Sequence, residues 1–111
     1  MIESPRLKQI IAFLEENPGD AFLTFALAKE YEGLGALDQA LETYLQLCKQ
    51  HPDYVGTYYH LGKLYEQKEA EKKAFETYRK GMEVAKKAGD QHALSELAGA
   101  KLNLGDDEDF E

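Results

Sequence analysis

The strongest constraint on the fold of this chain is an internal repeat with a period of 34 residues. At that offset, residues 21–54 align with residues 55–88, and nine aligned positions are identical. The identical pairs are Leu27/Leu61, Lys29/Lys63, Tyr31/Tyr65, Glu32/Glu66, Ala36/Ala70, Ala40/Ala74, Glu42/Glu76, Thr43/Thr77 and Tyr44/Tyr78. Because small, aromatic and aliphatic residues all match at one offset, the two segments are expected to be copies of one structural unit.

Within each copy the matched residues follow a helical spacing in two separate segments. Leu27 and Tyr31 lie four residues apart, which places them on one face of a helix, and Ala40 and Tyr44 do the same on a second. Small residues recur at positions 28, 40, 62 and 74, where they allow two helix backbones to approach closely. In the first copy, Gly33 and Gly35 lie between the two segments and can supply the left-handed backbone that a tight turn needs. Each copy is therefore predicted to be a helical hairpin.

This pattern resembles the tetratricopeptide-repeat family, whose unit runs W-x2-L-G-x2-Y, then A-x3-F, then P. The first copy matches it with Thr24, Leu27, Ala28, Tyr31, Ala40, Tyr44 and Pro52. The second copy matches it with Tyr58, Leu61, Gly62, Tyr65, Ala74 and Tyr78. Thr24 replaces the usual large aromatic, and Lys86 stands in place of the second proline, so we expect the last helix of this copy to reach about Ala88. The resemblance implies an all-α fold, a right-handed superhelical stack of antiparallel helix pairs.

Segments outside the two copies complete the predicted domain, which spans residues 1–105. Residues 4–16 are expected to form an N-terminal helix equivalent to the second helix of a repeat, and residues 90–103 a terminal or capping helix. Residues 106–111 hold five acidic residues, so residues 1–105 carry only −3 of the formal charge of −8. This segment is predicted to be an acidic disordered tail.

The resemblance implies that the first helix of each copy lines a concave groove that binds a partner. The groove positions carried over from the family include Phe22, Phe25, Lys29, Tyr59, His60 and Lys63, and the terminal helix adds Leu97. Aromatic rings in such a groove would hold a peptide segment or a helix of another protein, and the lysines would pair with its carboxylates. A structural interpretation stays open: the phenylalanines pack against the N-terminal helix, and each lysine pairs with the glutamate three residues later.

Composition argues against several other classes of partner. A net charge of −8 disfavours both nucleic acid and anionic membrane surfaces as partners. No apolar stretch is as long as a membrane-spanning helix requires, and the first residues do not form a secretory signal. The single cysteine, Cys48, allows no internal disulfide, which fits a reducing compartment. A cytoplasmic location is the expectation.

No arrangement of residues indicates an enzyme, a cofactor or a metal site. The three histidines lack the spacing of a metal-binding pair on one helix. A zinc site formed by His60 and His92 is conceivable, but no third ligand is evident. The family also includes proteins that grip the C-terminal carboxylate of chaperones with a lysine and an asparagine, and this chain has no asparagine at those positions.

Two further possibilities involve the second half of the chain. Self-association is the alternative function, with a homodimer formed through the open end of the helix stack or through the leucines of the terminal helix, Leu94, Leu97, Leu102 and Leu104. As an alternative to a disordered tail, the acidic segment folds back onto the basic residues that are interleaved with glutamates between Lys68 and Lys87, or into the groove. There it would compete with an acidic partner.

Overall fold

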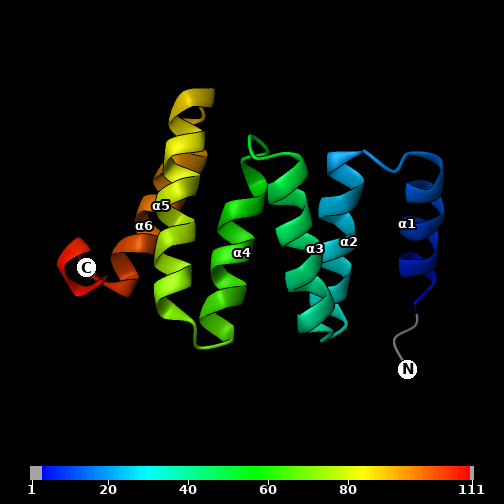
Figure 1. The fold of residues 1–111 in the computed structure, drawn as a ribbon, viewed down its shortest axis with the longest axis horizontal. Helices are drawn as coiled ribbons and strands as arrows, with labels where there is room; N and C mark the ends of the chain where they lie inside the picture. Colours follow the sequence, from blue (N-terminus) through cyan, green and yellow to red (C-terminus); the bar gives the residue numbers. More distant parts are fainter. Residues whose placement is uncertain (1–3, 111) are drawn as a thin grey trace. The chain divides into compact units, whose positions relative to one another are not determined.

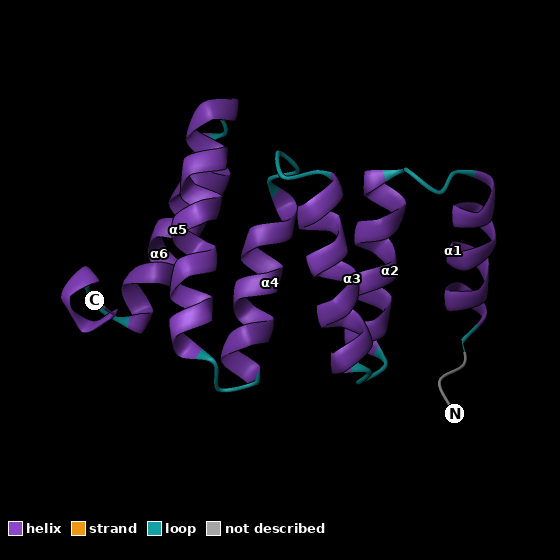
Figure 2. Ribbon diagram, in the orientation of Figure 1, coloured by secondary structure: helices purple, strands orange, loops and turns teal. Residues whose placement is uncertain are grey.

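The computed structural model describes residues 4–110, and within this range every regular element is a helix (Figures 1 and 2). The chain divides into two compact units, one ending at His51 and one beginning at Pro52. The first unit contains α1 (Pro5–Glu16), α2 (Ala21–Gly33) and α3 (Leu37–Gln50). The second contains α4 (Gly56–Gln67), α5 (Glu71–Ala88), α6 (Gln91–Leu104) and the short 3-10 helix η1 (Asp107–Phe110). The predicted all-α fold class is confirmed.

The small residues of the repeat lie where the two helices of each hairpin pack together. In the first unit α2 packs against α3, and in the second α4 packs against α5. Ala28, Ala40 and Ala74 are completely buried, so their helices approach with only a methyl group between them. At Gly62 a Cβ atom would lie 2.1 Å from Cε1 of Tyr78, and the close approach of α4 to α5 therefore requires a glycine there.

Polar side chains immediately before three helices explain where those helices begin. The side chains of Ser4, Asp20 and Asp90 each accept a hydrogen bond from the backbone N–H three residues later, at 2.9, 2.9 and 3.0 Å. Each bond satisfies an N–H group that has no partner within its own helix. Asp90 is thus the N-cap of α6.

The turns between the paired helices also repeat with the 34-residue period. Gly35 has φ +77°, and Glu69, the equivalent residue of the second hairpin, has φ +60°. Glycine takes this left-handed conformation without steric cost, whereas glutamate does not. The second hairpin therefore keeps the turn of the first at some cost in backbone strain. Helix α5 ends at Ala88, as its missing proline predicts.

The segment after α6 differs from the expectation of a disordered tail. Residues Asp107–Phe110 form the helix η1 and contact α5 and α6 of the same unit. The aromatic ring of Phe110 is the physical reason, since it gives an otherwise acidic segment an apolar group to bury. Glu111 lies outside the described residues.

Candidate functional site

Each hairpin has a pair of contacting aromatic rings, and the two pairs occupy equivalent positions. In the first, the ring of Phe25 on α2 lies against Tyr44 on α3, with centroids 6.3 Å apart. In the second, Tyr59 on α4 lies against Tyr78 on α5, with centroids 6.4 Å apart. Both inner tyrosines are completely buried, whereas Phe25 and Tyr59 are only partly buried. Each hairpin thus presents an aromatic ring at its surface, supported from beneath by a second ring.

A glutamate on the first helix of each hairpin holds the buried tyrosine in place. The hydroxyl of Tyr44 donates to the carboxylate of Glu32, and the hydroxyl of Tyr78 donates to the carboxylate of Glu66. The pKa of each tyrosine is raised well above its ordinary value, first by burial of the phenol and then by the adjacent carboxylate. At neutral pH the tyrosines are therefore uncharged donors.

On α2 the predicted site residues next to this aromatic pair face solvent. The side chain of Phe22 is 64% exposed, which makes it one of the most exposed large apolar residues of the chain. Lys29 is also exposed. Phe25 is partly buried because it rests on Tyr44. The alternative in which Phe22 packs against the N-terminal helix does not fit an exposure this large.

On α4 the corresponding residues contact one another. The ring of His60 lies edge-on to Tyr59, with centroids 5.6 Å apart. The ammonium group of Lys63 lies 5.5 Å from the centroid of Tyr59 and 3.8 Å from a carboxylate oxygen of Glu66. For Lys63 the structure therefore realises the predicted pairing with the glutamate three residues later. That pair is half exposed, so its lysine remains accessible to an incoming carboxylate.

Leu97 does not belong to this surface, and its assignment as a groove residue is wrong. Its side chain is only 1% exposed and packs against α5, where a Cβ atom at Gly81 would lie 3.1 Å from both of its methyl groups. Leu102, by contrast, is 69% exposed. The leucines of α6 therefore point in different directions, and they do not form the single apolar stripe that the self-association alternative uses.

Two glutamates have a role that the sequence analysis did not assign. Glu32 and Glu66 were expected to pair with lysines, but each one also accepts the hydroxyl of the buried tyrosine twelve residues later. A signal for this was present, because both members of the pair recur at the 34-residue offset. Nothing in that recurrence, however, shows which of the repeated side chains touch.

Within residues 4–110 no group of three or more His, Cys, Asp and Glu side chains is placed to hold a metal ion. His92 lies 3.8 Å from the carboxylate of Glu96 on the same helix. Over this range, no helix combines the length and the apolar composition needed to span a bilayer.

Comparison with protein-family models gives two matches, which overlap along the repeat. A model described as TPR repeat matches residues 28–69, and one described as Tetratricopeptide repeat matches residues 55–87. No curated protein is similar enough to this chain to count as a match.

Solved structures provide closer relatives. A tetratricopeptide repeat domain protein from Salinibacter ruber, solved in solution by NMR, is 47% identical, with a TM-score of 0.75 over 78% of this chain and 88% of its own. A crystal structure of a tetratricopeptide repeat domain protein from the same organism is also 47% identical, with a TM-score of 0.74 over 77% and 96% of the two chains. A protein from Bordetella parapertussis is 24% identical, with a TM-score of 0.74 over 93% and 89%, and supports the fold alone.

Proposed function

Because the chain belongs to the tetratricopeptide-repeat family, we propose that it binds another protein through the equivalent surfaces of α2 and α4. Tetratricopeptide repeats generally mediate interactions between proteins, and proteins of this family are generally scaffolds without enzymatic activity. The observation that carries the proposal is the repeated aromatic pair, which supports a partly exposed ring on each hairpin. On the second hairpin Lys63 lies beside that ring.

The exposure of Phe22 supports a role in binding rather than in stability. A phenylalanine side chain that is 64% exposed contributes little to the core, yet it offers a large apolar surface to a partner. Aromatic side chains of this kind often supply most of the binding energy of an interface. We therefore assign Phe22 and Phe25 on α2, and Tyr59 and His60 on α4, as aromatic contacts for the partner.

The lysines indicate the chemistry of the bound segment. Lys29 and Lys63 occupy equivalent positions, and the ammonium group of Lys63 lies beside the ring of Tyr59. The bound peptide or helix would insert an apolar side chain against such a ring. A carboxylate near that side chain would then pair with the lysine. A short segment held in this way typically binds with micromolar affinity, about −8 kcal/mol.

The experiment compares three variants of the full chain as bait in extracts of the native cell. Phe22→Ala and Tyr59→Ala each remove a ring from the proposed surface, and Phe13→Ala serves as the matched control because Phe13 is an exposed phenylalanine on α1. The captured partner is then titrated by calorimetry against each variant. Loss of an aromatic anchor worth about 2 kcal/mol weakens binding roughly thirtyfold.

Circular dichroism on each variant separates loss of binding from loss of fold. We expect Phe22→Ala and Tyr59→Ala to weaken binding and Phe13→Ala to leave it unchanged, all with wild-type helicity. If both variants on α2 and α4 bind the partner as tightly as wild type, the proposed surface is wrong.

Self-association remains the second candidate, and one observation favours it. Helix α1 exposes two large apolar side chains, Ile11 and Phe13, which are 38% and 46% exposed. Large apolar side chains left exposed on a helix are a common starting point for a dimer interface. Light scattering over a range of concentrations measures this directly. A dimer that dissociates in Phe13→Ala would support self-association through α1, and a monomer at all concentrations would exclude it.

A further inference from the structure

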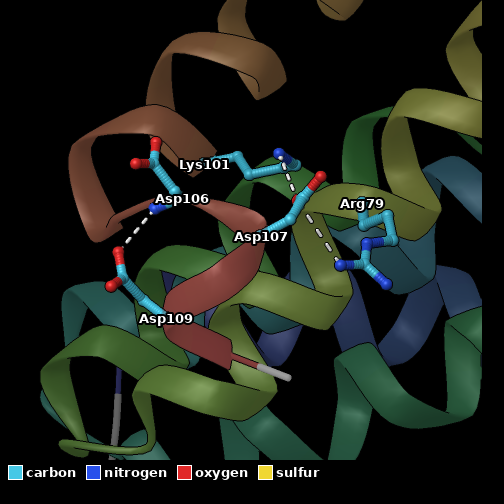
Figure 3. A network of polar contacts seen from close by, with 5 residues as sticks. All are labelled: Arg79, Lys101, Asp106, Asp107 and Asp109. Carbon is cyan, nitrogen blue, oxygen red and sulfur yellow. Dashed lines mark hydrogen bonds and ion pairs between the residues drawn. The ribbon is translucent and has the colours of Figure 1, made fainter.

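The segment from Gly105 to Phe110 forms a turn that is held by contacts within the segment. Gly105 has φ +146°, a conformation open to glycine and strained for other residues, and it reverses the chain after α6. The carboxylate of Asp109 then accepts a hydrogen bond from the backbone N–H of Asp106, at 2.7 Å (Figure 3). This bond closes the turn that becomes η1.

Two residues of the segment contact neighbouring side chains of α5 and α6. The ring of Phe110 stacks on Phe75 of α5, with centroids 4.3 Å apart and planes inclined by 14°. The carboxylate of Asp107 accepts hydrogen bonds from Lys101 of α6 at 3.1 Å and from Arg79 of α5 at 3.5 Å (Figure 3). Because a 3-10 helix has three residues per turn, side chains at positions 107 and 110 lie on one face of η1.

The receiving surface is built from one aromatic ring and two cations, and we call these residues, Phe75, Arg79 and Lys101, the Phe75 site. The ammonium group of Lys101 lies 4.8 Å from the centroid of Phe75, and the guanidinium carbon of Arg79 lies 5.3 Å from it. A carboxylate and an aromatic ring three residues apart thus match the two kinds of group in the site. Lys101 and Arg79 also hold the pKa of Asp107 below its ordinary value.

The polar contacts of the segment are exposed and therefore exchangeable. The side chains of Asp107 and Arg79 are 66% and 51% exposed, so water and salt compete with their ion pair. An open pocket of about 560 Å³ is lined by Arg79, Lys101 and Asp107 together with Met82, Lys86 and Leu94 of α5 and α6. A ligand seated like the segment would have room to extend into this pocket.

We propose that the Phe75 site binds acidic segments of partner proteins in which a carboxylate precedes an aromatic residue by three positions. Residues Asp107 and Phe110 are its internal occupant, and they keep the site closed until such a partner displaces them. The site consists of residues of α5 and α6 and shares none with the surfaces proposed above, so each proposal can fail without the other.

The test uses a fluorescent peptide with the sequence of residues 105–111, Gly-Asp-Asp-Glu-Asp-Phe-Glu, titrated against the full chain by fluorescence polarisation. Phe110→Ala removes the internal ring and leaves the Phe75 site intact. When a competing internal segment occupies most molecules, its release raises the apparent affinity by the inverse of the open fraction, which we expect to be about tenfold. A peptide with alanine in place of its phenylalanine should not bind.

Two further substitutions in the Phe110→Ala background locate the bound peptide. Lys101→Ala should weaken binding about tenfold, because it removes the closest partner of the aspartate. Lys80→Ala is the matched control, since Lys80 is an exposed lysine on α5 that pairs with Glu83 rather than with the segment. Binding should also weaken as salt is raised.

A second way of releasing the segment guards against a misfolded variant. Gly105→Ala strains the positive φ and places a Cβ atom 2.6 Å from the carboxylate of Asp109, while every side chain of the Phe75 site stays wild type. If the peptide binds neither released variant, the segment is only a cap on the end of α5 and α6, and the proposal is wrong. Equal binding to the Lys101→Ala and Lys80→Ala variants would also overturn it, as would a wild-type dimer held together by exchanged segments.

Discussion

Replacing Tyr78 with phenylalanine removes only the hydroxyl that donates to Glu66, and it keeps the ring that supports Tyr59. Tyr78 is completely buried, and its partner is a carboxylate. A hydrogen bond to a charged group contributes about 1.5–3 kcal/mol to stability. The side chain of Glu66 is 31% exposed, so water replaces part of the lost bond. We therefore expect the free energy of unfolding to fall by about 1.5 kcal/mol, near the lower limit of that range.

Urea unfolding followed by circular dichroism measures this change through the shift of the midpoint at constant slope. A double-mutant cycle with Glu66→Gln isolates the pair, and its coupling energy should be about 1 kcal/mol. Tyr44→Phe should give a loss of similar size, because Tyr44 and Glu32 form the equivalent bond of the first hairpin. Tyr31→Phe is the control, since the hydroxyl of Tyr31 makes no hydrogen bond to any residue between 4 and 110.

The reasoning is refuted by either of two results. In the first, Tyr78→Phe unfolds at the wild-type urea concentration, which would mean that water satisfies Glu66 equally well. In the second, Tyr78→Phe destabilises the Glu66→Gln protein as much as the wild type, which would assign the effect to the ring environment rather than to the pair.

Three other predictions concern the same repeated elements. Stability should fall as pH rises above about 10, because the unfolded chain then releases the protons of Tyr44 and Tyr78 while the folded chain keeps them. Urea unfolding at pH 8 and pH 11 measures this fall. The variant with phenylalanine at both positions should lose less stability between the two pH values. Glu69→Gly should raise the free energy of unfolding by about 1 kcal/mol because it removes the strain of a positive φ, and thermal unfolding with no rise in the midpoint would contradict this. Gly62→Ala should destabilise by about 1–2 kcal/mol in urea, because overlap with Tyr78 outweighs the better helix propensity of alanine; a more stable variant would refute this.

The amino-acid sequence determines the helical hairpins of this protein. Their helices follow from local spacing, since Leu27 with Tyr31 and Ala40 with Tyr44 each recur on one face of a helix. The 34-residue period marks equivalent positions without any knowledge of contacts, which is why the aromatic residues Phe25 and Tyr59 could be placed in equivalent roles.

Other features of the candidate sites depend on residues that are distant in sequence, and only the tertiary structure decided them. The family resemblance assigned Leu97 to the groove, but Gly81 leaves its side chain a place in the core. The acidic composition of residues 106–111 predicted a disordered tail. In the structure, however, Phe110 stacks on Phe75, which lies thirty-five residues earlier in the sequence. Periodicity along one helix reports which side chains share a face. Periodicity does not show which side chains of a neighbouring element contact that face. Burial and the energy of side-chain pairs depend on those contacts.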